Sequence, residues 1–250
     1  MTPEKFVLQI CGWLVGIPLE ILLLAALIRG EWRRYPMVFC YAVALLLTTL
    51  VEIPFYLGSW ITRNAATMHQ FAQIYWVNDW VLQVLIFATV LSLIDQAISP
   101  FNWRRVLRAG LTAGALLFAA ISFSVQYRPS PAKIGYWMTP WTRDLGVCAT
   151  ILDLALWMIL IASRKSDRRL LLISGALGIQ FTGEAIGEAI RSLSIPSMAK
   201  AIALTGSVVG MLADLACLYL WWQTFRSREP VHAGHPSLEK SRGEVPPRLW

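Results

Sequence analysis

Histidine and cysteine are scarce in this chain, which has three histidines and four cysteines among 250 residues. The cysteines form no CxxC pair and lie singly within apolar stretches, so we interpret them as small packing residues (Cys11, Cys40, Cys148 and Cys217). His69 is the only histidine close to those stretches, whereas seven-helix zinc amidases use several histidines inside the membrane. Serine, histidine and aspartate also form no catalytic set. We therefore expect no metal site, no cofactor and no enzymatic activity.

Charged residues are scarce as well. They make up 15% of the chain, against about 25% in soluble domains, while 56% of the residues are hydrophobic and 12 are tryptophan. A single soluble core could not enclose so much apolar surface. The composition therefore predicts an all-α protein that crosses a membrane several times.

Seven apolar stretches are each long enough for a helix that spans a membrane, which requires about 20 residues. We place them at about 7–28, 36–58, 70–98, 105–125, 137–163, 170–192 and 200–223. Helix-breaking residues support these limits, because Gly30 follows the first stretch, Pro36 opens the second and Pro100 follows the third. The sequence thus predicts a polytopic seven-transmembrane-helix bundle within residues 1–226.

Basic residues are unevenly distributed between the two sets of connections. The richer side holds Arg29, Arg33, Arg34, Arg104, Arg105, Arg108, Arg164, Lys165, Arg168, Arg169, Arg226 and Arg228. The poorer side holds Lys5, Arg63, Arg128, Lys133, Arg143, Arg191 and Lys200. The positive-inside rule then predicts an external N-terminus and a cytoplasmic C-terminus in a bacterial inner membrane. Topology and contact with anionic lipid explain the net charge of +7, so we expect no nucleic-acid partner.

The two ends of the chain differ in character. The first stretch is longer than the apolar region of a signal peptide and has no small-x-small cleavage site before Arg29, so we expect it to be retained as a helix. Residues 227–250 are rich in proline, serine and charge, which predicts a disordered cytoplasmic tail. This tail is too short for a folded output domain.

Polar side chains within the apolar stretches are the most informative residues, because a carboxylate at membrane depth is costly unless a partner or water receives it. Gln180, Glu184, Glu188 and Arg191 form one polar stripe on the sixth helix. The other candidates for a ligand site or a proton relay are Glu52, Asp79, Gln83, Arg143, Asp153 and Asp214. Most of these residues fall in the outer half of their helices, although Asp153 falls near the midplane and Asp214 in the inner half. We therefore expect a hydrated polar pocket that opens to the outside.

This pocket has two interpretations. Arg143 and Arg191 could neutralise some of the acids, which would make the group an internal network of ion pairs and hydrogen bonds. Alternatively, the acids outnumber the arginines because they bind a small polar or cationic ligand, or relay protons. We favour the ligand site, since an ion-pair network leaves several acids without a visible partner.

Pairs of glycines four residues apart occur at a similar depth in three of the predicted helices. They are Gly12 and Gly16, Gly183 and Gly187, and Gly206 and Gly210. Small residues at this spacing let helix backbones approach closely. We therefore expect the seventh helix to pack against the sixth helix, the first helix or both.

Three short features carry a resemblance to known proteins. They are Tyr75-Trp76 with an acid shortly after, the run 85–98 with Asp95 near its end, and the aromatic exit Trp221-Trp222. In these features the chain resembles a group of uncharacterised bacterial seven-helix proteins. It is similar, more distantly, to the seven-helix sensor regions that precede some bacterial histidine kinases. The resemblance implies a stand-alone membrane module whose signal would pass to a separate cytoplasmic partner.

The sequence favours a sensory or ligand-binding membrane protein over two alternatives. One alternative is a proton- or cation-coupled transporter with Asp153 at the midplane, although we find no repeat between the first three and the last three stretches. The other is a membrane scaffold with a structural ion-pair network. A retinal pigment is not expected, because residues 201–223 include no lysine for the Schiff base.

Overall fold

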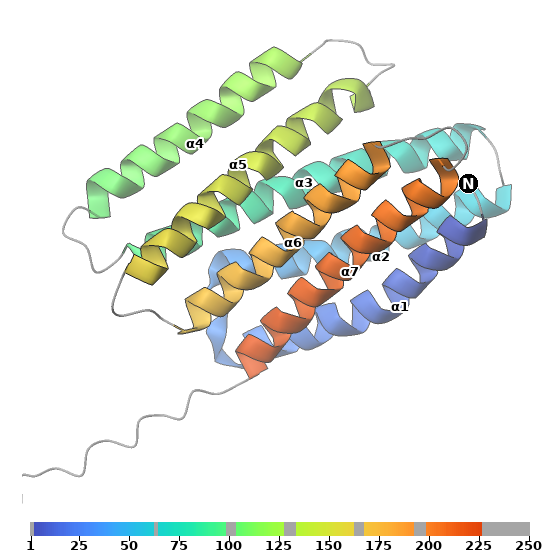
Figure 1. Ribbon diagram of the computed structural model, residues 1–250. Helices are drawn as coiled ribbons and strands as arrows, with labels where there is room; N and C mark the ends of the chain where they lie inside the picture. Colours follow the sequence, from blue (N-terminus) through green and yellow to red (C-terminus); the bar gives the residue numbers. More distant parts are fainter. Residues whose placement is uncertain are drawn as a thin grey trace, which may run out of the picture.

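The computed structural model describes residues 3–62, 65–98, 104–127, 134–162, 168–192 and 199–226 (Figure 1). Its helices are α1 (Pro3–Ala26), the π-helical turn η1 (Leu27–Glu31), α2 (Pro36–Thr62), α3 (Ala65–Ala97), α4 (Arg104–Gln126), α5 (Ile134–Ala162), α6 (Arg168–Ser192) and α7 (Ala199–Arg226). Seven of them are long and apolar enough to cross a bilayer, and no strand occurs in these residues. The prediction of an all-α, multi-pass membrane protein with seven spanning helices is therefore confirmed. The predicted tail at 227–250 lies outside the described residues.

Most helices extend beyond the limits expected from the apolar stretches. The first helix begins at Pro3 and the third at Ala65, because polar residues that enter the headgroup region can continue a helix. The π-helical turn was not predicted. It contains Gly30 at φ +147°, a backbone conformation that residues with a side chain rarely adopt, and this explains why a glycine stands where the first stretch ends.

Six helices form a closed ring. In this ring α1 contacts α2 and α7, α3 contacts α2 and α5, and α6 contacts α5 and α7. Helix α4 lies outside the ring, next to α5 at the edge of the bundle (Figure 1). Among its described side chains only those of Ala115 and Ser122 are buried. The interior of the bundle is therefore the space enclosed by the other six helices.

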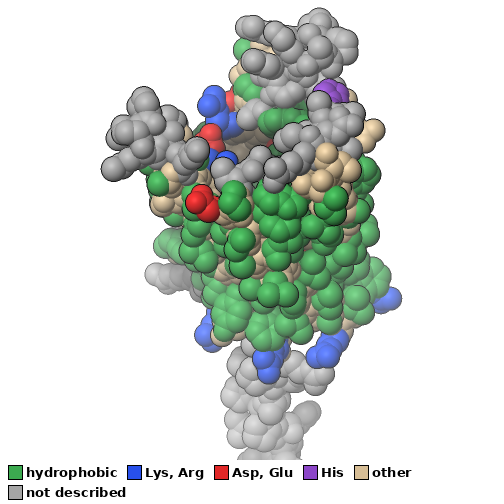
Figure 2. All heavy atoms as spheres, turned by 90° about the vertical axis from the view of Figure 1, so that its right-hand side faces the viewer, with side chains coloured by type: hydrophobic (Ala, Val, Ile, Leu, Met, Phe, Trp, Pro, Cys, Tyr) green, Lys and Arg blue, Asp and Glu red, His purple; other side chains and the backbone are tan. Residues whose placement is uncertain are grey.

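The apolar core fills one half of this ring, at the end where α1 and α7 finish. Leu23, Leu27, Val38, Ile94 and Trp221 are all at most 2% exposed there. We call this end the base and the opposite end the upper end. On the face that Figure 2 draws, a broad hydrophobic band lies between basic side chains at the base and charged side chains of both signs around a hollow at the upper end. The largest fully buried side chains of the described residues all lie in the base half.

Helices α6 and α7 make the closest packing in the ring. A Cβ atom at Gly187 would lie 2.6 Å from the carbonyl oxygen of Gly206 and 3.4 Å from the amide nitrogen of Gly210. A Cβ atom at Gly183 would overlap the side chain of Ala213. The absence of side chains on these glycines thus brings the two backbones into contact.

Helix α7 also packs on α1, through the other pair of glycines. A Cβ atom at Gly12 would lie 3.0 Å from the Sδ atom of Met211, and one at Gly16 would lie 3.8 Å from Leu215. These contacts involve side chains rather than backbone, so α1 stands farther from α7 than α6 does. Helix α7 is consequently held between α1 and α6, the two neighbours that the glycine pairs predict.

Candidate functional site

Carboxyl groups from four helices of the ring lie near one another in its upper half. Glu52 of α2 is close enough to Asp79 of α3 for their charges to interact. Glu184 of α6 is close in the same sense to both Asp79 and Asp214 of α7. We call these four residues the carboxyl cluster. Neighbouring carboxylates repel one another at this depth, so the cluster requires protons, water or a cation for compensation.

Neutral groups from adjacent helices hold two of these acids. Asn78 Nδ2 donates a hydrogen bond of 3.0 Å to Glu52 Oε1, which links α3 to α2. The side chain of Thr142 on α5 is hydrogen-bonded to Asp79. Each bond fixes the direction of a carboxyl group without neutralising its charge. The acids on this side of the ring are therefore positioned, and they stay available to a cation.

Gln180 connects the other two acids to the apolar base. Its Nε2 atom lies 3.5 Å from Glu184 Oε1, one turn along α6, and 3.5 Å from the hydroxyl oxygen of Tyr41 on α2. Asp214 also interacts with the side chains of Gln180 and Glu184. The Oδ1 atom of Asp214 is buried, and no hydrogen-bond donor among the described residues reaches it. A buried acceptor without a donor is costly, which marks this point as one where a donor is missing.

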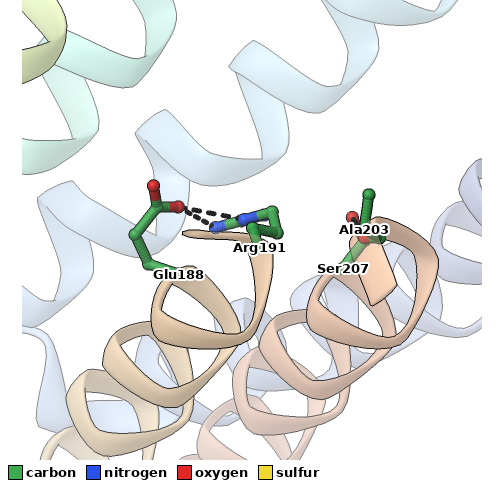
Figure 3. A network of polar contacts seen from close by, with 4 residues as sticks. All are labelled: Glu188, Arg191, Ala203 and Ser207. Carbon is green, nitrogen blue, oxygen red and sulfur yellow. Dashed lines mark hydrogen bonds and ion pairs between the residues drawn. The ribbon is translucent and has the colours of Figure 1, made fainter. Parts of the chain in front are cut away.

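The two arginines proposed from the sequence do not lie in equivalent positions. Arg191 donates from Nε and Nη2 to Glu188 Oε2 at 2.9 and 2.7 Å, at the upper end of α6 (Figure 3). It is also near enough to Glu184 to influence its charge. Arg143 is exposed, and it forms no ion pair with the residues that the structure describes. The ion pair of Arg191 is thus made with the outermost acid of the stripe rather than with the carboxyl cluster.

Figure 3 also shows how the ends of α6 and α7 meet beside this ion pair. Ser207 of α7 donates to the carbonyl oxygen of Ala203 at 2.9 Å, so its hydroxyl is satisfied within its own helix. A Cβ atom at Gly206 would lie 2.8 Å from the Cγ atom of Arg191. The glycine therefore leaves room for the stem of the arginine to cross α7.

Asp153 and Gln83 occupy separate positions at the contacts of α5. Asp153 is 2% exposed and accepts a hydrogen bond of 2.6 Å from Ser174 Oγ on α6. The Nε2 atom of Gln83 on α3 lies 3.0 Å from the place where a Cβ atom at Gly146 would be. Both side chains thus join α5 to a neighbouring helix, in addition to any role in binding.

Several polar residues that matter here were not candidates from the sequence. Tyr41, Thr142 and Ser174 are residue types common in membrane helices, and their partners lie on other helices far along the chain, so spacing alone gives no signal. Glu20 is another buried acid, at 5% exposure, whose Oε1 atom lies 3.4 Å from Thr49 Oγ1. Its position as a carboxylate within the first apolar stretch was a signal available from the sequence.

The chain matches no family model, and neither a curated protein nor a solved structure is similar to it. Within the described residues, no three histidine, cysteine, aspartate or glutamate side chains come together as a group that could hold a metal ion. The carboxyl cluster and its surroundings are therefore the basis for a functional interpretation.

Proposed function

We propose that the protein binds a small cationic molecule at the carboxyl cluster, within a membrane-embedded sensory module. One observation carries the proposal. Four carboxyl groups from four helices lie near enough to one another for their charges to interact, while the nearby arginine forms its ion pair with Glu188. A cation that enters the cluster would relieve the mutual repulsion of the carboxylates and supply the donor that the Oδ1 atom of Asp214 lacks.

The upper end is the side from which such a molecule would arrive. The Glu184 side chain is exposed although it interacts with groups on α3 and α7, and Figure 2 shows charged side chains around a hollow at this end. The arginine-rich base corresponds to the cytoplasmic side under the positive-inside rule. In a bacterial inner membrane the N-terminus would then be outside, and the ligand would be an external solute.

Closure of the base supports binding rather than passage through the ring. Trp221 is fully buried there, donates from Nε1 to the carbonyl oxygen of Ile173 at 3.1 Å, and packs edge-on against Tyr41 with ring centroids 5.7 Å apart. Tyr41 also accepts from Gln180, which interacts with Glu184. A ligand that moves Glu184 would therefore displace groups that lead to the base, where a cytoplasmic partner could respond.

Substitution of Glu184 by glutamine tests this proposal, because glutamine keeps the shape of the side chain and removes its charge. Protein in lipid nanodiscs would be titrated by calorimetry with sodium, methylammonium and phenethylammonium chloride in turn. We expect saturable binding of at least one cation, weakened about tenfold by Glu184→Gln. Glu4→Gln is the control. Glu4 is exposed at the start of α1, outside the carboxyl cluster, and its substitution should change the affinity less than twofold.

The proposal fails if none of the three cations binds saturably, or if Glu184→Gln binds them as the parent does. Accumulation of the bound cation in proteoliposomes, driven by a pH gradient and abolished by Asp153→Asn, would indicate the transporter instead. If the parent and the variant are both folded and neither binds any of the cations, the scaffold is favoured. Both the resemblance to sensor regions and the expected lack of enzymatic activity remain predictions.

A further inference from the structure

A row of aromatic rings in contact with one another lies beside the carboxyl cluster, toward the upper end. The ring of Tyr56 on α2 packs against Phe6 and Trp13 of α1, with centroids 5.9 and 5.2 Å away. On its other side lies Phe71 of α3, at 5.5 Å. Phe71 in turn lies 6.3 Å from Tyr75 of the same helix. We call Tyr56, Phe71 and Tyr75 the aromatic layer.

The tyrosines of the aromatic layer lie one helical turn above the acids, and Phe71 lies one turn above Tyr75. Tyr56 follows Glu52 by four residues on α2, and Tyr75 precedes Asp79 by four residues on α3. Residues four apart share a helix face and differ in height by roughly one turn, about 5.4 Å. Because α2 and α3 run in opposite directions (Figure 1), both tyrosines lie on the upper side of their acids. A molecule entering from the upper end would meet the rings first and the carboxyl groups next.

Tyr75 joins the two layers. Its hydroxyl group is near enough to Asp79, Glu52 and Glu184 to interact electrostatically with them. Its side chain is nevertheless 45% exposed. Tyr75 shares a helix face with Asp79, which is hydrogen-bonded to α5. Part of the ring face is consequently free to contact a ligand.

The combination of layers differs from what an inorganic cation requires. Such an ion is bound by several oxygen atoms gathered around one point, and the faces of aromatic rings add no oxygen ligands to it. Aromatic faces attract the positive end of an organic ammonium ion, and they also pack against its apolar part. The buried and unpaired Oδ1 atom of Asp214 is an acceptor that an N–H donor would satisfy.

Taking the cation site of the proposed function as its starting point, we infer that the ligand is an organic ammonium ion with an apolar or aromatic portion. The ammonium group donates to the carboxyl cluster, with Glu184 and Asp214 on one side and Asp79 on the other. The apolar portion extends upward along Tyr75, one turn above Asp79, to Phe71, two turns above it. The carboxyl cluster thus selects for charge, and the aromatic layer selects for size and shape.

Three probes separate these contributions in the parent protein. Phenethylammonium has both a charge and a ring, 2-phenylethanol has the ring alone, and methylammonium has the charge alone. We expect phenethylammonium to bind at least about tenfold more tightly than either of the other two, in calorimetric titrations of nanodisc-embedded protein. Sodium chloride at matched ionic strength controls for screening.

Phe71→Leu tests the aromatic layer, because it removes a ring and no charge. It should weaken phenethylammonium binding about fivefold and leave methylammonium binding unchanged. Phe39→Leu is the control, since Phe39 packs on Trp32 at the base, with ring centroids 6.3 Å apart. It should alter neither affinity.

The outcomes distinguish this inference from the proposed function. If methylammonium or sodium binds as tightly as phenethylammonium and Glu184→Gln weakens that binding, the cation site stands and the inference about an organic ligand is wrong. If 2-phenylethanol binds as tightly as phenethylammonium, the charge plays no part and both proposals fail. If none of the probes binds, both also fail. The comparison among probes uses the parent protein, so it holds even if Phe71→Leu does not fold.

Discussion

Replacing Gly187 with alanine should push α6 and α7 apart and destabilise the bundle. The new Cβ atom would lie 2.6 Å from the carbonyl oxygen of Gly206, whereas ordinary contact begins at 3.4 Å. A backbone oxygen cannot rotate out of the way as a side chain can. The two helices must therefore separate locally by roughly 0.8 Å, the difference between these two distances.

Two effects of opposite sign determine the size of the change. Forcing an additional methyl group into a packed contact costs about 1–3 kcal/mol. Alanine also favours the helix over glycine by about 1 kcal/mol, which offsets part of that cost. We therefore expect Gly187→Ala to lower the free energy of unfolding by about 1–2 kcal/mol. The same displacement should weaken cation binding, because it moves Asp214 away from Glu184.

Gly114→Ala provides a control with the opposite sign. A Cβ atom at Gly114 of α4 would meet no atom within 4 Å, so only the helix preference of alanine remains and this variant should be slightly more stable. Reversible unfolding in mixed detergent micelles, followed by circular dichroism as the fraction of sodium dodecyl sulfate rises, compares the two. The reasoning is refuted if Gly187→Ala is as stable as Gly114→Ala.

Two further predictions concern polar contacts between helices. Ser174→Ala removes the donor of Asp153 and should destabilise the protein by about 1–3 kcal/mol in the same unfolding assay, whereas Ser124→Ala, whose hydroxyl bonds within exposed α4, should have almost no effect. Arg169 of α6 is largely buried and pairs with Glu31 of the π-helical turn, so Arg169→Gln alone should cost about 3 kcal/mol or more. The double variant with Glu31→Gln should recover part of that loss, and additive losses would show that the pair is not coupled.

The number of helices follows from the sequence because each is a continuous apolar run of sufficient length. The inward position of Glu184 follows as well, since Gln180 lies one turn before it on the same helix face. The arrangement of the helices in space does not follow. Nothing in the residues of α4 distinguishes it as the helix outside the ring, because lipid and protein interior are both apolar and give similar patterns.

The contacts of the site were predicted less well than its depth. The bond between Asp153 and Ser174 joins two helices through a contact that spacing cannot reveal. Arg191 lies three residues after Glu188, a spacing that allows an ion pair within one helix. From the sequence alone Arg191 could pair with any acid of the pocket, because helix spacing does not give distances across the ring. The position of a residue in the sequence gives its depth along a helix. Which side chains contact each other depends also on how each helix is rotated and on which helices lie next to it.

The exclusion of α4 from the ring has an electrostatic consequence. Because α4 only returns the chain across the bundle, α3 and α5 stand next to each other and run in the same direction, as α7 and α1 also do (Figure 1). Four of the six helices in the ring therefore begin at the upper end, and their backbone dipoles do not cancel as they would in an alternating ring. Each helix N-terminus carries about half a positive elementary charge, so the upper rim is positive and the base negative in its backbone. The backbone of the ring thus favours acidic side chains at the upper end and arginines at the base.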